Sequence, residues 1–149
     1  MGELKQILLV EDSRNDVGLI LSALEEYKLA NRVVVKRDGA EALEYLSDLA
    51  RSSADLPVLV LLDVKMPKVD GLQVLRTMKA DAALKKVPVV MLTSSREQTD
   101  LIRSYDLGAN SYVVKPVRFT EFVDAVKKLG VYWILLNEAP PYQPDRPGP

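Results

Sequence analysis

The sequence predicts an α/β protein with one doubly wound sheet of five parallel strands and helices on both faces. Apolar runs of strand length alternate five times with segments of helical spacing, and the connections between them are short. The central run, residues 57–63, carries five consecutive aliphatic residues without alternation. Such a run is typical of a strand whose two faces are both buried, as in a parallel sheet.

The strands are expected at short apolar runs that end at a polar residue or a proline. They comprise residues 6–10, 33–35, 57–63, 87–93 and 112–115. Pro88 is tolerable because it falls at the beginning of its strand. Pro116 follows the last run directly and stops that strand.

The helices are expected where apolar residues recur every three or four positions. They comprise residues 14–27, 39–50, 71–80, 97–107 and a last helix from residue 118 to the proline pair at 140–141. Ser13 with Asp16 forms a capping signature at the start of the first helix. Asp-Gly pairs at 38–39 and 70–71 precede the second and third helices, and Gly108 ends the fourth.

The sequence indicates one domain, residues 1–137, followed by a proline-rich tail, residues 138–149, that is expected to be flexible. It shows no internal repeat.

The composition excludes several kinds of site. The chain has 149 residues, 48% of them apolar and 28% charged, and a net charge of −1 without a long basic run, so no nucleic-acid partner is expected. Cysteine and histidine are both absent, which excludes disulfides, thiolate or imidazole metal sites and Ser-His triads. No apolar run reaches the roughly 18 residues that span a membrane, and no signal peptide begins the chain. We therefore expect a cytoplasmic protein with no membrane partner.

Charged and hydroxyl side chains stand at the ends of four predicted strands. These residues are Glu11, Asp12, Asp63, Thr93, Ser94 and Lys115. In a doubly wound sheet the carboxyl ends of the strands converge on one edge. Carboxylates brought together there repel one another, and a hard divalent cation such as Mg²⁺ relieves the repulsion. A hydroxyl and an ammonium group suit the oxygens of a phosphoryl group.

Each of these residues alone has a simpler explanation. Asp63 could cap the next turn, and Glu11 and Asp12 could be acids that favour the start of a helix. Thr93 is an ordinary strand residue, and Lys115 could be a solvated charge. Their coincidence at four strand ends favours a functional site.

The constellation resembles the receiver domain of two-component response regulators over about residues 6–129. The matching features are the Glu11-Asp12 pair, Asp63 in LLDVKMP, Asp70-Gly71, Thr93 in MLTSS and Lys115-Pro116. The resemblance implies the flavodoxin-like strand order 2-1-3-4-5. It also implies that Asp63 is the phosphoacceptor.

The resemblance further implies a metal site in which Glu11, Asp12, Asp63 and the backbone carbonyl of Lys65 hold Mg²⁺. Many members of the family have two aspartates where this chain has Glu11 and Asp12. Because Glu has the longer reach, the acid that ligates the metal directly is left open.

By the same resemblance, Thr93, Ser94 and Lys115 would contact the phosphoryl oxygens, and Thr93 and Tyr112 would act as the switch. The chain would be a phosphoacceptor in signalling, with slow autodephosphorylation, and not a conventional enzyme. No output domain is expected after Leu136, so it would act as a free-standing messenger or as a member of a phosphorelay. Since it has no histidine, the phosphohistidine must belong to a partner sensor kinase. The ending, residues 131–141, is similar to single-domain regulators that serve bacterial phytochromes.

The six residues 131–136 are apolar without a break. A surface helix needs only one apolar stripe, and the positions of Phe122, Val126 and Leu129 already provide it. We therefore expect this run to be surplus to the core and to form a homodimer interface through the last helix. The alternative is that the run folds back over its own domain.

Other classes of protein share parts of the pattern. A flavin-binding module would share the strand order but needs a phosphate-cradling loop where Glu11 and Asp12 stand. An aspartyl-phosphate hydrolase would also use Asp63, but it usually has an acid two residues on, where this chain has Lys65. A receiver-like scaffold that is never phosphorylated is a third possibility.

Overall fold

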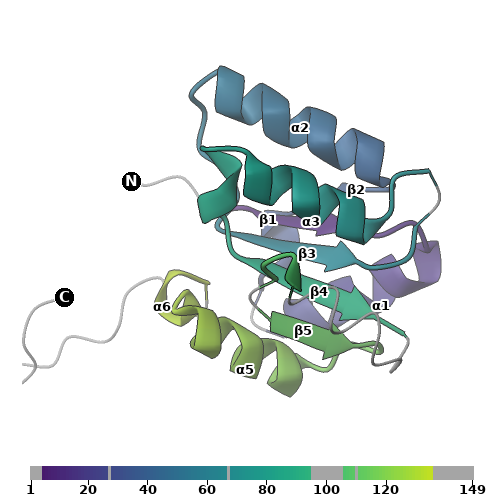
Figure 1. The fold of residues 1–149 in the computed structure, drawn as a ribbon. Helices are drawn as coiled ribbons and strands as arrows, with labels where there is room; N and C mark the ends of the chain where they lie inside the picture. The colour runs from purple at the N-terminus through teal and green to yellow at the C-terminus, as the bar shows by residue number, and fades with distance from the viewer. Residues whose placement is uncertain (1–4, 27, 67, 95–105, 110, 136–149) are drawn as a thin grey trace, which may run out of the picture.

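A five-stranded parallel sheet forms the centre of the computed structural model, which describes residues 5–26, 28–66, 68–94, 106–109 and 111–135. Its strands are β1 Ile7–Val10, β2 Val33–Lys36, β3 Leu59–Asp63, β4 Val89–Thr93 and β5 Ser111–Val114. All neighbours pair in parallel, in the order β2-β1-β3-β4-β5 (Figure 1). The predicted fold class and strand order are confirmed.

Helices cover both faces of the sheet. They are α1 Arg14–Glu25, α2 Gly39–Arg51, α3 Gly71–Ala80, α5 Phe119–Leu129 and the short α6 Tyr132–Leu135, with 3₁₀ turns η1 Ala30–Arg32 and η2 Leu84–Lys86. The hydrophobic core accordingly forms two clusters, one on each face of the sheet. Helices α1 and α5 pack in one cluster, and α2 and α3 pack in the other. The predicted helix at 97–107 lies almost wholly outside the described residues, as does the predicted tail at 138–149.

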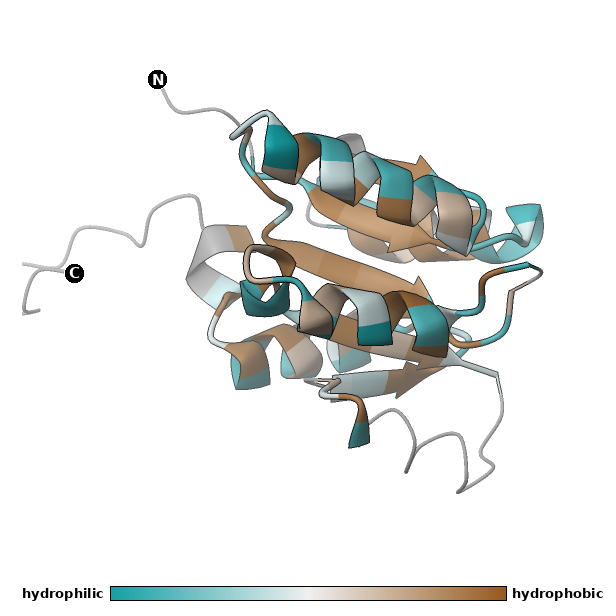
Figure 2. Cartoon of the chain, turned by 45° about the horizontal axis from the view of Figure 1, so that its top comes forward, coloured by the Kyte–Doolittle hydropathy of each residue, from teal (hydrophilic) through white to brown (hydrophobic). Residues whose placement is uncertain are grey.

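The central strands are buried on both faces, as their uninterrupted apolar runs predict. In β3, Leu59 and Leu61 face the cluster of α1 and α5, whereas Val60 and Leu62 face that of α2 and α3. All four side chains are fully buried. Figure 2 shows the consequence, with hydrophobic strands enclosed by helices whose outer sides are largely hydrophilic.

Local signals set where the helices begin. The side chains of Ser13, Asp38 and Asp70 each accept a hydrogen bond from a backbone N–H in the first turn of α1, α2 and α3, which confirms the three predicted starts. Gly71 has a second role. A β-carbon added there would lie 1.9 Å from the Asp63 carbonyl oxygen, so only glycine lets α3 begin directly against the end of β3.

The prediction of one continuous last helix is wrong. Helix α5 ends at Leu129 because Gly130 adopts a left-handed conformation, with φ of 76°, and caps it. The chain then turns into α6. The side chains of Val131 and Leu135 are 7% and 2% exposed and belong to the core cluster of α1 and α5.

The prediction that the whole run 131–136 lies outside the core is therefore wrong for Val131 and Leu135. These two residues fold back over their own domain, as the alternative predicted. Buried Arg32 fastens this end of the chain by donating hydrogen bonds to the carbonyls of Lys5 and Leu135, at 2.8 and 3.1 Å. The side chains of Trp133 and Ile134, and all of Leu136, lie outside the description. In the part of the chain that the structure describes, no helix is both long and apolar enough to cross a membrane.

Candidate functional site

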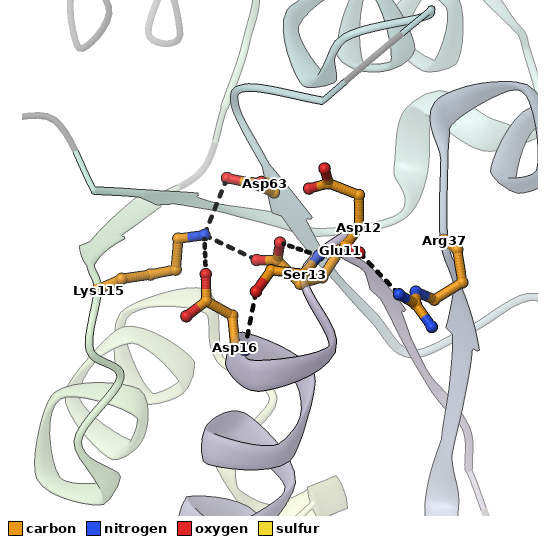
Figure 3. A network of polar contacts seen from close by, with 7 residues as sticks. All are labelled: Glu11, Asp12, Ser13, Asp16, Arg37, Asp63 and Lys115. Carbon is orange, nitrogen blue, oxygen red and sulfur yellow. Dashed lines mark hydrogen bonds and ion pairs between the residues drawn. The ribbon is translucent and has the colours of Figure 1, made fainter.

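Three strand ends bring an ammonium group and two carboxylates together at one edge of the sheet. Lys115 follows β5, and its backbone N–H donates to the Thr93 carbonyl at 2.7 Å, which fixes it beside β4. Its Nζ lies 2.8 Å from Oε1 of Glu11, just after β1, and 3.4 Å from Oδ1 of Asp63, at the end of β3 (Figure 3). The predicted convergence of these side chains is present.

Glu11, Asp12 and Asp63 form a compact acidic cluster. Each offers a carboxylate oxygen, and these oxygens all lie within 4.8 Å of one another. Glu11 and Asp63 are buried, at 0% and 4% exposure, and Asp12 is half-buried. Burying carboxylates this close together without a counter-charge is unfavourable, because the negative charges repel one another and lose their hydration. An all-oxygen donor set of this kind could hold a hard divalent cation.

The environment of Asp63 opposes its ionisation. Burial raises the pKa of this carboxyl from 3.8 to about 7, and the negative charge of Glu11 adds to the rise. The ammonium of Lys115 acts in the opposite direction but does not cancel these effects. A cation beside Asp63 would favour the ionised form.

The ammonium of Lys115 has a third carboxylate neighbour. Asp16, in the first turn of α1, places Oδ2 at 2.9 Å from Nζ. Burial alone would lower the pKa of Lys115, but the hydrogen bonds to Glu11 and Asp16 and the charge of Asp63 raise it above its ordinary value. The sequence pattern assigned Asp16 only to the helix cap. Its place in the first turn of the helix that follows the acidic pair was the available signal.

The two adjacent acids differ in what they bind. Both oxygens of Glu11 are engaged, because Oε2 accepts a hydrogen bond from the Ser13 backbone N–H at 3.1 Å and Oε1 accepts from Lys115. Among the described residues, nothing donates a hydrogen bond to the carboxylate of Asp12. Figure 3 shows that carboxylate on the same side of the site as that of Asp63.

Arg37 holds the backbone beside the acidic pair. Its guanidinium, just after β2, donates to the carbonyl oxygen of Asp12 at 2.7 Å. Its buried Nε has no hydrogen-bond partner in the described part of the chain. Arg37 was not predicted as a site residue, because it lies between the predicted strand at 33–35 and the Asp38-Gly39 pair and belongs to no recognised motif.

The remaining predicted site residues lie around this centre. Thr93 is buried at the end of β4, next to β3 in the sheet, and Ser94 after it is exposed. Lys65 is exposed two residues beyond Asp63. Tyr112 lies on β5 with 36% of its surface exposed and lines a cavity of about 390 Å³ along β5 and α5. Metal ligation by the Lys65 carbonyl and switching by Tyr112 stay predictions.

Known proteins match this chain along most of its length. A family model of the response regulator receiver domain matches residues 7–127. The structure of the bacteriophytochrome response regulator AtBRR is 56% identical, with a TM-score of 0.79, over 91% of this chain and 99% of that one. The probable methanogenesis regulatory protein FilR2 of Methanothrix harundinacea is 40% identical over 134 residues, 90% of this chain and 86% of FilR2.

Response regulator Rcp1 of Synechocystis sp. is 35% identical over 131 residues, 87% of this chain and 89% of Rcp1. The crystal structure of its Mn(2+)-bound form is 33% identical, with a TM-score of 0.67, over 91% of this chain and 97% of that one. The family model reaches from β1 into α5, and these relatives are matched over nearly their whole length. The chain therefore belongs to the family of response regulator receiver domains of two-component signalling.

Proposed function

We propose that this chain accepts a phosphoryl group on Asp63 from the phosphohistidine of a sensor kinase, in a reaction that requires Mg²⁺. The observation that carries the proposal is the position of the Asp63 carboxylate, which is buried at the end of the central strand, within the acidic cluster and 3.4 Å from the Lys115 ammonium. The family match supports this reaction over flavin binding or hydrolysis.

We assign direct metal ligation to Asp12 and Asp63, with the carbonyl of Lys65 as a further ligand. Glu11 is the less available acid because Ser13 and Lys115 already engage both of its oxygens. Glu11 would then act mainly by holding Lys115, although one of its oxygens stays within 4.8 Å of the other two acids. The Mn(2+)-bound form of Rcp1 shows that a relative takes a divalent cation.

The transfer itself would be a displacement at phosphorus. An ionised oxygen of Asp63 attacks, the new O–P bond forms as the N–P bond of the phosphohistidine breaks, and the imidazole leaves. Lys115 and the hydroxyls of Thr93 and Ser94 contact the phosphoryl oxygens and orient the group. The bound cation supplies positive charge that neutralises these oxygens.

The output would be a change of surface. Thr93, drawn toward the phosphoryl group, would leave space for Tyr112 to move inward from its exposed position on β5. The rearranged surface of β5 and α5 would carry the signal.

The histidine that donates the phosphoryl group must lie outside these 149 residues, since they contain none. The likeness to AtBRR supports a bacterial phytochrome as the kinase, and such a reaction would occur in the cytoplasm. The homodimer stays a prediction. With Val131 and Leu135 buried, it would rest on the other apolar residues of 131–136, and light scattering of the intact chain against Trp133→Glu tests it.

Intact-mass measurement tests the acceptor. Wild-type protein incubated with acetyl phosphate and Mg²⁺ should gain one phosphoryl group, and Asp63→Asn should gain none. Asp55→Asn, which removes an exposed carboxylate just before β3, is the control and should be labelled as wild type. Labelling of Asp63→Asn at the wild-type level would contradict the assignment.

A further inference from the structure

Asp16 binds the same ammonium group as the acceptor but lies outside the acidic cluster. Its Oδ2 is 2.9 Å from Nζ of Lys115, and its own backbone N–H donates to the Ser13 hydroxyl at 3.2 Å. The side chain of Lys115 is 11% exposed and that of Asp16 is 30% exposed, so the pair is largely shielded from solvent. The capped first turn of α1 thus holds this carboxylate against Lys115.

The three hydrogens of a lysine ammonium limit how many partners it can serve. Glu11 and Asp16 accept hydrogen bonds at 2.8 and 2.9 Å, whereas Asp63 at 3.4 Å is the most distant of the three carboxylates. A phosphoryl group on Asp63 brings more negative charge to the same nitrogen. It must share Lys115 with Asp16 or displace it.

We propose that Asp16 is a positioning residue that holds Lys115 and competes with the phosphoryl group on Asp63 for it. The inference deepens the proposed function and rests on it. Asp16 also adds a negative charge facing Asp63 across one ammonium group. That charge attracts a cation at the acidic cluster and repels an anion on Asp63, so its removal affects the two ligands with opposite sign. If Asp16 served only to maintain the structure, its substitution would weaken the binding of both the cation and the anion.

The test uses Asp16→Asn, which keeps the shape and an oxygen acceptor for Lys115 but removes the charge. Calorimetric titration measures the Kd of Mg²⁺ alone and then the Kd of beryllofluoride, an inorganic phosphoryl mimic, at saturating Mg²⁺. We expect beryllofluoride to bind about fivefold more tightly than in wild type and Mg²⁺ to bind about twofold more weakly. Thermal melts without metal establish that the variant is folded.

Two further variants control for charge and position. Asp16→Glu keeps the carboxylate and should behave much closer to wild type than Asp16→Asn. Glu25→Gln removes one exposed charge from the other end of α1 and should leave both constants unchanged. Unchanged or weaker beryllofluoride binding by Asp16→Asn, beside normal binding by wild type, would overturn the role of Asp16 alone. Failure of wild type to bind beryllofluoride would overturn the proposed function as well.

Discussion

Replacing Asp63 with Asn should stabilise the metal-free protein at neutral and alkaline pH. Burial and the charge of Glu11 raise the pKa of Asp63 from 3.8 to about 7 in the folded state. Between these values the folded protein keeps a proton that the unfolded chain has lost. The contribution of this group to stability therefore falls as the pH rises from about 4 to about 7, and the penalty is complete above pH 7.

The two pKa values set the size of the penalty. Their difference corresponds to about 4 kcal/mol at most. We expect Asp63→Asn to recover about 2 kcal/mol of this, because its buried amide must itself be hydrogen-bonded. Lys115 keeps Glu11 and Asp16 as partners in the variant, so no buried cation is left alone.

Urea denaturation of both proteins with a chelator present, at several pH values from 5 to 8, measures the effect. The free energy of unfolding of Asp63→Asn should exceed that of wild type by an amount that grows with pH and levels off above about pH 7. In thermal melts at pH 8, the Tm of the variant should be higher by about 4–8 °C. Added Mg²⁺ should reduce or reverse this difference in stability between the variant and wild type, because it binds and stabilises wild type more. Asp55→Asn, at an exposed position, should show no pH-dependent gain. An advantage that does not change with pH, or a loss of stability at pH 8, would refute the electrostatic reasoning.

Four other substitutions test the site and the helix beside it. Asp12→Ala should nearly abolish Mg²⁺ binding and phosphorylation yet raise the metal-free melting temperature, and a lower one would show that repulsion within the acidic cluster is not the dominant effect. Gly71→Ala should lower the free energy of unfolding, measured by urea denaturation, by about 2 kcal/mol or more, because the added β-carbon meets the Asp63 carbonyl. Gly18→Ala is the comparison: its added β-carbon meets no atom within 4 Å, so this variant should stabilise α1 by about 0.5–1 kcal/mol. Lys65→Ala should shorten the half-life of the phosphorylated protein severalfold if the exposed ammonium obstructs the hydrolytic water, and an unchanged or longer half-life would count against that role.

The sheet and the edge that carries the site could be predicted because backbone periodicity determines both. An aliphatic run of strand length such as that of β3, in a chain where such runs alternate with helical segments, is typical of a sheet covered on both faces. Once the strands are parallel, their carboxyl ends must meet. Asp63, Glu11 and Lys115 therefore come together although Lys115 lies 104 residues from Glu11. Strand starts were less accurate: Pro88 cannot donate to the ladder, and β4 begins only after it.

Contacts that depend on the direction of a side chain were not predictable in the same way. The sequence around Asp16 accounts for it as part of the helix cap. Its second interaction is with Lys115, which lies 99 residues away along the chain and could not be paired with it from local sequence. The end of α5 was a different kind of error. Helical spacing continues through Gly130. Lysines in the last turn with a glycine just after the last helical residue are a recognised C-terminal signal, and the prediction gave more weight to the apolar spacing.

One methylene group separates the roles of the two acids that follow β1. Glu11 is long enough for one oxygen to reach the Ser13 backbone and the other to reach Lys115, and these bonds hold its charge within the protein at 0% exposure. The shorter Asp12 receives no such bond among the described residues and lies half-buried toward Asp63. A carboxylate without protein partners keeps its lone pairs for a cation, whereas a carboxylate bonded twice must give up a partner to bind one. The geometry thus favours a division in which Glu11 holds the lysine and Asp12 holds the metal.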